Sequence, residues 1–253
     1  MTSPSEIPSA LLPAAGCLKS RVILVTGANG SLGRAAAIAF AAHGATVVLH
    51  GRNAAKLEPV YDEIEAAGGI QPAMLTLDFF KAAETEYKAL ADTIYATFKR
   101  LDGIFHAAGH IAPLTPLALQ DLAGWQAHHS VNYMAPILLT RACLPMLKRA
   151  PAASVVFLSE THALSSQAYW GAFAVTKSAL HKTAAIWNDE LEHETTLRLR
   201  VLVPGPVASH CRSVTHPGEL TSQLPAIDTL TPAFLLLMSA DARLPSATVY
   251  QLS

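Results

Sequence analysis

A glycine-rich stretch at residues 26–33, TGANGSLG, is the first segment of the chain with the composition of a binding site. It follows an apolar run rich in β-branched residues and precedes a segment of helical composition. Glycines let the main chain approach a phosphate closely, and the following helix offers N–H donors and the positive end of its dipole. Three glycines alone are a weak signal, but this context predicts a pyrophosphate-binding turn. The expected contacts are Gly27, Asn29, Gly30, Ser31, Leu32 and Gly33.

One arginine indicates which dinucleotide this turn binds. Arg52 follows the second apolar run, 19 residues after Gly33. An acidic side chain at such a place accepts from a ribose 2′-hydroxyl, whereas an arginine accommodates a 2′-phosphate. No Asp or Glu occurs between Gly44 and Lys56. The sequence therefore favours NADP(H) over NAD(H), and the alternative interpretation is a solvated surface arginine.

The hydrophobic pattern predicts the elements that hold these residues. Short apolar runs predict strands at 21–26, 45–50, 73–77, 103–107, 154–159, 197–203 and 248–252. Helical patterns occur at 31–43, 53–67, 81–100, 121–148, 169–192 and 231–240. Strands that are apolar on both faces and alternate with helices are typical of a parallel sheet covered on both sides. We expect a single α/β domain over residues 19–253, a Rossmann-type doubly wound parallel sheet of about seven strands with helices on both faces.

Two segments lack a regular pattern. Residues 1–18 are rich in Pro, Ser and Ala, and we expect a disordered leader rather than a lipoprotein signal, because Glu6 and three prolines interrupt the segment. Residues 209–230 lack clear periodicity. We expect them to form a mobile loop with one short helix, which shapes the substrate pocket.

Composition excludes several classes of protein. The 253 residues are 51% hydrophobic and 15% charged, which favours a compact globule. The net charge of −1 provides no strong field for nucleic acid or an anionic membrane, and no apolar run reaches about 18 residues. Cys17, Cys143 and Cys211 are too scattered to predict a disulfide framework or a zinc site. We expect a cytoplasmic protein with no metal and with neither nucleic acid nor a membrane as partner.

The motifs, in their order and spacing, resemble the short-chain dehydrogenase/reductase family over nearly the whole chain from about Leu18. The resemblance rests on the glycine turn, Asp78, HAAG at 106–109, Asn132, Lys177 and PGPVAS at 204–209. It implies that Asp78 contacts the adenine and that Lys177 binds the nicotinamide ribose. It also implies cofactor contacts from Ala108, Gly109, Pro204, Gly205 and Ser209, with Ser209 at the carboxamide.

Two departures from the family pattern concern the cofactor half. The glycine spacing is TGxxGxxG, which is similar to the extended branch of the family, and Ser31 can still donate to a phosphate. His106 and Ala107 replace a pair of asparagines, a change expected to affect mainly the support of the fourth strand.

The departures in the catalytic set are larger. In the family, Ser and Tyr hydroxyls hold a carbonyl substrate, Tyr transfers the proton during hydride transfer, Lys assists Tyr, and Asn supports a relay water. Asn132 and Lys177 match, but the Tyr position holds Phe173 and the Ser position holds Glu160. Ser159 is one residue away, and on a strand its side chain is expected on the opposite face.

Phenylalanine cannot transfer a proton, and a positioned acid or base typically contributes ~10²–10⁴-fold to the rate. Glu160 is the first candidate to replace it, because a carboxyl in an apolar pocket can act as an acid. The alternative, which we favour, is an ion pair between Glu160 and Lys177. His162 and His110 lie on loops expected to line the site, and we favour loop positions without a catalytic role over proton donation.

Two functions remain open. The first is an NADP(H)-dependent oxidoreductase of an unidentified small molecule, with Asn132, Glu160 and Lys177 as its catalytic residues. Reduction of an activated C=C or C=N bond would depend less on a Tyr. The second is a cofactor-binding protein with little or no turnover, acting as a sensor or an assembly partner. The helices at 121–148 and 169–192 match those through which family members pair, so we expect a homodimer or homotetramer in either case.

Overall fold

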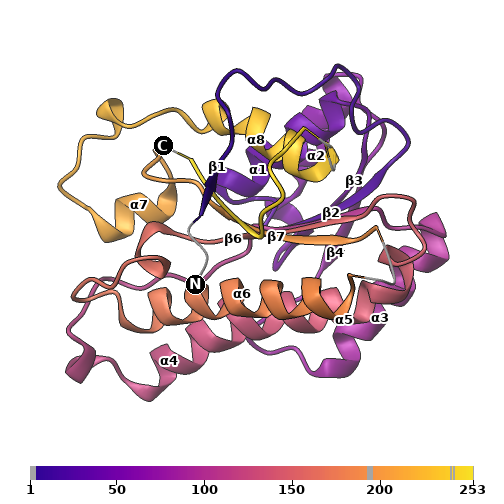
Figure 1. The fold of residues 1–253 in the computed structure, drawn as a ribbon. Coiled ribbons are helices and arrows are strands. Elements are labelled where there is room, and N and C mark those ends of the chain that lie inside the picture. Colours follow the sequence, from indigo (N-terminus) through magenta and orange to yellow (C-terminus); the bar gives the residue numbers. More distant parts are fainter. Residues whose placement is uncertain (1–3, 193–195, 240, 242, 253) are drawn as a thin grey trace.

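The computed structural model describes residues 4–192, 196–239, 241 and 243–252 (Figure 1). Eight strands form one sheet: β1 (Ser5–Glu6), β2 (Val22–Thr26), β3 (Thr46–Gly51), β4 (Ala73–Thr76), β5 (Gly103–His106), β6 (Ser154–Leu158), β7 (Arg198–Val203) and β8 (Val249–Gln251). The pairings between these described strands are parallel, in the order β1-β8-β7-β6-β5-β2-β3-β4. The chain order reverses between β2 and β5, so a crevice forms outside the carboxyl ends of these two strands.

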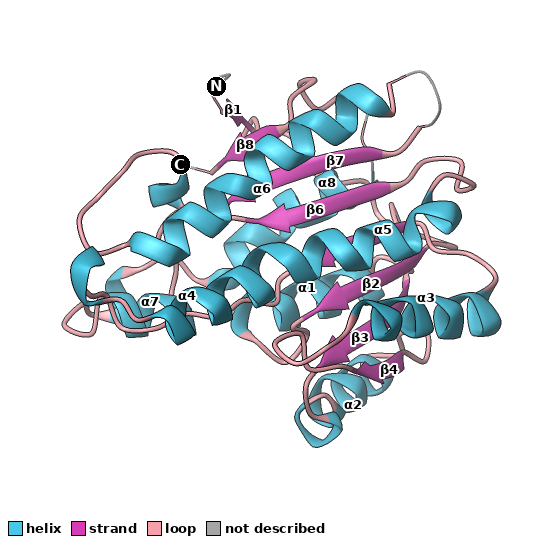
Figure 2. Cartoon of the chain, turned by 90° about the horizontal axis from the view of Figure 1, so that it is seen from below, coloured by secondary structure: helices cyan, strands magenta, loops and turns pink. Residues whose placement is uncertain are grey.

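Helices cover both faces of the sheet. They are α1 (Ser31–Ala42), α2 (Glu58–Ala66), α3 (Glu84–Phe98), α4 (Leu122–His128), α5 (Ala135–Leu147), α6 (Gly171–Glu190), α7 (His210–Thr215) and α8 (Thr231–Ser239). A π-helical turn, His129–Met134, joins α4 to α5 without a break. Helices α1, α2 and α8 lie on one face, and α3, α5 and α6 lie on the other (Figure 1; Figure 2). The expected doubly wound α/β fold is confirmed, with one strand more than about seven.

The strands are apolar on both faces because both faces are buried. In β2, Ile23 and Val25 face the cluster that includes Phe40 of α1, whereas Leu24 faces the cluster that includes Leu139 of α5. Each fully buried side chain of this kind contributes about 1.5–3 kcal/mol to folding. The two clusters therefore hold β2 firmly, and with it the turn that follows at its carboxyl end.

A row of polar groups crosses the carboxyl end of the sheet. Thr26 pairs in register with His50 on one side and with His106 on the other. His106 Nε2 lies 2.9 Å from Thr140 Oγ1, and Thr26 Oγ1 accepts a hydrogen bond from Ala108 N at 3.1 Å. Burial lowers the pKa of His50 to about 4 and that of His106 to about 3, so both rings are neutral at pH 7. These groups support the end of β5, as expected for position 106.

The amino-terminal segment differs from the expectation of a disordered leader. In its described part, Ser5 and Glu6 form β1 and pair with Tyr250 and Gln251 at the edge of β8. Leu18 is completely buried in the core. A free sheet edge offers unpaired main-chain groups to any neighbouring extended segment, and two residues are too few to show a strand pattern in the sequence.

The segment at 209–230 contains the expected short helix, α7, followed by turns at Thr221–Gln223 and Ile227–Leu230. No helix of the described residues is both long enough and apolar enough to span a bilayer.

Candidate cofactor and active site

The glycine turn after β2 is built from main-chain geometry. Gly27 has φ +62°, and a Cβ at this position would lie 2.7 Å from Ala108 Cα. A Cβ on Gly33 would overlap the carbonyl oxygen of Gly27. Gly30 is the N-cap of α1 and no side chain caps that helix, so the first N–H groups of α1 are available to an anion. The turn therefore has the geometry of a phosphate-binding site.

Ser31 connects this turn to the segment that follows β7. Its Oγ accepts a hydrogen bond from His210 N at 3.2 Å. His210 is the first residue of α7, and Ser209 caps that helix by accepting from Arg212 N. This hydrogen bond holds the beginning of α7 next to the phosphate turn.

A cavity at one end of the crevice gathers the residues expected to bind the adenosine part. It is lined by Gly27, Asn29, Gly30, Arg52, Asp78, Ala108 and Gly109, and also by His50, Lys56 and Lys81. Arg52 is exposed, and none of the described carboxylates lies within ion-pair distance of it. Three cationic side chains, Arg52, Lys56 and Lys81, therefore face this cavity, two of which sequence reasoning missed.

At the other end, α6 places Phe173 beside Lys177. The two side chains are 7% and 6% exposed, and Lys177 Nζ lies 5.9 Å from the centre of the Phe173 ring. Tyr169 is 55% exposed and precedes α6, eight residues before Lys177. The position next to the lysine is thus occupied by an aromatic ring without a hydroxyl.

Lys177 is held by the end of β6. Its ammonium donates to Leu158 O at 2.7 Å. Burial lowers the pKa of Lys177 to about 8, although Cys211 and Glu160 act in the opposite direction. The side chain is therefore a buried donor whose charge is lost in mildly basic solution.

The expected ion pair between Glu160 and Lys177 is wrong. Glu160 Oε2 instead lies 2.8 Å from His162 Nδ1. A short 3₁₀ turn, Thr161–Ala163, brings His162 back over Glu160. The ammonium of Lys177 instead donates its hydrogen bond to the carbonyl oxygen of Leu158. Oε1 of Glu160 is buried and has no hydrogen-bond partner. The His162 ring is stacked on Trp170, with ring centres 3.8 Å apart and planes 20° apart.

Ser159 follows the last residue of β6 and lines the same cavity as Glu160. Its Oγ lies 2.7 Å from Nε2 of His181, which is one helical turn after Lys177. Burial, together with the nearby charge of Lys177, lowers the pKa of His181 to about 4. The hydroxyl of Ser159 is engaged by α6 and does not replace the missing Ser.

Asn132 is completely buried in the π-helical turn. Its Nδ2 donates to His110 O at 2.9 Å, and its Oδ1 accepts from His110 N at 2.6 Å. Both ends of the amide are therefore used to hold the loop after Gly109. Asn132 positions this loop and is not among the residues that line the cavities.

A second cavity joins the phosphate turn to the end of β6. Among the expected residues it gathers Gly30, Ser31, Leu32, Gly33, Gly109, His110, Glu160, His162, Phe173, Lys177, Pro204, Gly205 and Ser209. Sequence reasoning missed Trp170 and Cys211, which also line it. Only their closeness in the sequence to expected site residues could have indicated them, since Cys211 is two residues after Ser209 and Trp170 is three residues before Phe173. Arg212, at the cavity edge, is neutralised by two hydrogen bonds to Glu219, of 2.5 and 2.6 Å.

Comparison with known proteins finds related sequences and structures over most of the chain. Residues 21–219 match the family model of the short chain dehydrogenases. The uncharacterized oxidoreductase YciK of Escherichia coli (strain K12) is 36% identical over 231 residues, which are 91% of each chain. A short chain dehydrogenase structure from Salmonella enterica serovar Typhi superimposes with a TM-score of 0.91 at 35% identity, covering 95% of this chain and 99% of the other.

A related structure was solved with a bound dinucleotide. It is an Escherichia coli CFT073 protein described as a short chain dehydrogenase and complexed with NADPH. The TM-score is 0.90 at 35% identity, over 94% of this chain and 99% of that protein.

Proposed function

The chain belongs to the short-chain dehydrogenase family, and from that premise we propose that it is an NADP(H)-dependent oxidoreductase with a non-standard proton donor. The observation that carries this proposal is the Glu160–His162 pair, which lies in the same cavity as Lys177. A carboxylate and an imidazole in contact can pass a proton between solvent and a bound substrate. The pair therefore supplies the function that Phe173 cannot.

The cofactor preference is supported by charge. Arg52, Lys56 and Lys81 line the adenosine cavity, and Asp78 is the one carboxylate among its described lining residues. Asp78 Oδ1 accepts from Phe80 N at 3.1 Å. A 2′-phosphate placed near these cations makes charge-assisted hydrogen bonds that a 2′-hydroxyl cannot make. The NADPH complex of a relative agrees with this preference.

Each residue of the reactive half has a separate duty in the proposed reaction. NADPH, when bound, supplies the hydride. Lys177 would donate to the ribose hydroxyls, Ser209 would meet the carboxamide, and Glu160 with His162 would deliver the proton. Asn132 acts as a positioning residue, because its amide holds the main chain of His110.

Calorimetric titration with NADPH and NADH tests the cofactor assignment. We expect Arg52→Ala to raise the Kd for NADPH by roughly 10–100-fold, the value of a hydrogen bond to a charged group, and to leave the Kd for NADH unchanged. Lys88→Ala, on the exposed side of α3, is the control, because Lys88 pairs only with Asp92 on its own helix in the described structure. Equal loss of affinity for both dinucleotides would contradict the assignment. Oxidation of NADPH by a panel of ketones, enones and imines tests the activity.

The alternative function is cofactor binding with little or no turnover. It is favoured by the burial of Phe173 against Trp170 and His128, because this ring occupies the position of the proton donor and has no group that can transfer a proton. This alternative would be established if the protein binds NADPH but no compound of the panel oxidises it.

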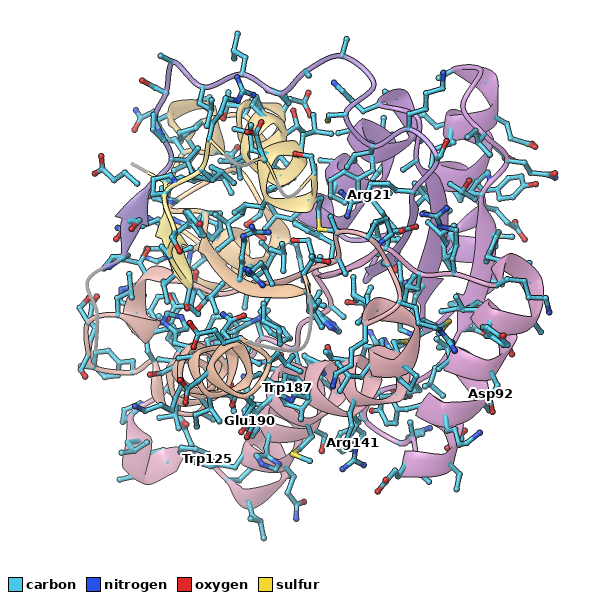
Figure 3. All side chains as sticks on the ribbon, turned by 45° about the vertical axis from the view of Figure 1, so that its right-hand side comes forward. Arg21, Asp92, Trp125, Arg141, Trp187 and Glu190 are labelled. Atoms are coloured by element: carbon cyan, nitrogen blue, oxygen red, sulfur yellow. The ribbon has the colours of Figure 1, made fainter. Side chains whose placement is uncertain are left out.

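Self-association through α4, α5 and α6 is part of the proposal. Trp125, Arg141, Trp187 and Glu190 of these helices appear in the lower half of the view in Figure 3, below Arg21. Val175 and Ile186 of α6 are 55% and 51% exposed, which leaves apolar surface for a partner copy. Sedimentation equilibrium is expected to show a homodimer or homotetramer.

A further inference from the structure

The cavity beside Lys177 lacks the two hydroxyls that hold a ketone oxygen and contains a carboxylate in their place. We propose that the substrate is a ring-bearing imine, which reacts as its iminium cation with Glu160 as counter-ion. This inference rests on the proposed NADP(H)-dependent reduction and names the class of substrate for it.

The first argument is the unsatisfied oxygen of Glu160. Oε2 accepts from His162, but Oε1 is buried without a hydrogen-bond partner. Burying a carboxylate oxygen without a donor is unfavourable, and an N–H⁺ group from a ligand removes that penalty. His162 is itself fixed by stacking on Trp170, so the carboxylate is held in one orientation. The site is therefore prepared for a ligand that donates a hydrogen bond and carries positive charge.

The second argument is the direction in which charge moves during reduction. Hydride addition to a ketone or an enone places negative charge on oxygen, which needs donors at that point. A carboxylate at the Ser position opposes such a charge. Hydride addition to an iminium ion removes a positive charge instead, so the carboxylate does not have to accommodate a new anion. The missing Tyr is then no obstacle, because the proton is already on the nitrogen when the hydride arrives.

The chemical balance needs only the proposed cofactor. The imine nitrogen takes a proton from solvent through the Glu160–His162 pair. The hydride from NADPH forms the new C–H bond, and the electrons of the C=N π bond become the lone pair of the amine. NADPH is oxidised to NADP⁺, and the imine is reduced to the amine.

The walls of the cavity fit a planar cation. Trp170 and Phe173 lie with their ring centres 6.0 Å apart, and both line the cavity with Glu160. Aromatic faces attract cations and pack against flat rings. Arg212 does not oppose a cation, because Glu219 neutralises it. The ammonium of Lys177 is held on Leu158 O, and its charge is partly offset by Glu160, the same carboxylate that would pair with the iminium ion.

The experiment compares two bicyclic compounds of the same shape with the full-length protein and NADPH. Dihydroisoquinoline is the imine, and α-tetralone is the ketone. We expect kcat/KM for the imine to exceed that for the ketone by about 10²-fold or more. Glu160→Gln keeps the shape but removes the charge, and it should lower kcat/KM for the imine by about 10²-fold. The control is Glu65→Gln on the exposed side of α2, which should change nothing.

A binding measurement keeps the test independent of turnover. The cation tetrahydroisoquinolinium, titrated calorimetrically without cofactor, should bind about tenfold more weakly to the Glu160→Gln variant and equally well to Glu65→Gln. Unchanged binding and unchanged imine reduction in Glu160→Gln would overturn the counter-ion role. Reduction of α-tetralone at least as fast as the imine would overturn the substrate class and leave the proposed function standing. If neither compound oxidises NADPH, the proposed substrate class is overturned. Calorimetric titration with NADPH then shows whether cofactor binding, on which the proposed function depends, has failed as well.

Discussion

The two ends of the crevice are built by different means. At the turn between β2 and α1, the shape of the main chain makes the site: Gly27 needs its positive φ, and Gly33 leaves no room for a Cβ. At β6 and α6, the site consists of functional groups on side chains such as Glu160, His162 and Lys177. A site made by the main chain is disrupted when a glycine gains a Cβ. In a site made by side chains, a substitution changes the chemistry while the fold stays intact. This difference explains how a standard cofactor framework can accompany a non-standard set of reacting groups.

The comparison predicts that the glycine turn is the most sensitive part of the molecule. Gly33→Ala places a methyl group on the carbonyl oxygen of Gly27, and we expect overpacking of this kind to cost about 3 kcal/mol in folding free energy. For a chain of this size that lowers Tm by roughly 6–12 °C. NADPH affinity should fall by at least about tenfold in calorimetry, because the first turn of α1 must shift.

The matched control is Gly218→Ala. Gly218 has nothing within 4 Å of the position where a Cβ would be, and its backbone does not need glycine. We expect its Tm and NADPH affinity to equal those of the natural protein. If Gly33→Ala behaves in the same way, the turn is not the rigid site described above.

The reactive half should accept changes that the turn would not. The double substitution Phe173→Tyr with Glu160→Ser restores both hydroxyls beside Lys177. We expect reduction of α-tetralone to rise by about 10²–10⁴-fold, the contribution of a positioned acid, with little change in Tm. Steady-state oxidation of NADPH measures this gain.

Each single substitution is the control for the pair, because one hydroxyl alone should give only part of the gain. A stable, NADPH-binding double variant that still does not reduce ketones would show that the pocket differs in shape as well as in its proton donor. The contrast between the two ends would then extend to the cavity walls.

The smallest expected effect is a pH dependence at the contact between the two halves. Burial places the pKa of Lys177 at about 8, below its ordinary value of 10.5. The ammonium is the form that donates to ribose hydroxyls, so NADPH affinity should be constant below pH 8 and fall up to about tenfold per pH unit above it. Folding responds in the opposite sense: since the folded-state pKa is depressed, stability from this group is gained as pH rises through about 8 to 10.5.

Calorimetry of NADPH binding at several pH values checks this prediction. Lys177→Met should bind NADPH more weakly and without the step near pH 8. A step that persists in Lys177→Met would assign the titration to another group.

Most of the fold could be predicted because it depends on burial. Short runs that are apolar on both faces are typical of the strands of a parallel sheet, and their order with the helices implies the doubly wound sheet. The two-residue β1 could not be found, because two residues show no periodicity. The π-helical turn at His129–Met134 was also missed: its residues have ordinary helical composition, and only the spacing of the hydrogen bonds differs.

The site could be predicted where position in the chain determines position in space. The glycine turn and Arg52 are predicted from their places between strands and helices, and the Phe173–Lys177 register from the resemblance to the family. The partner of Glu160 could not be predicted, because it depends on the course of the 3₁₀ turn that brings His162 back. Cys211 and Trp170 lie at the beginning of α7 and of α6, and each helix follows an irregular segment whose course sets the direction of its first turn.

The hydrogen bond from His210 N to Ser31 Oγ has a consequence for how a ligand arrives. A hydroxyl has two lone pairs and one proton, so an oxygen that already accepts from α7 can still donate to an incoming phosphate. Accepting one bond polarises the O–H and strengthens the other. A phosphate that accepts from Ser31 Oγ would therefore strengthen the hydrogen bond by which the same oxygen holds the first residue of α7.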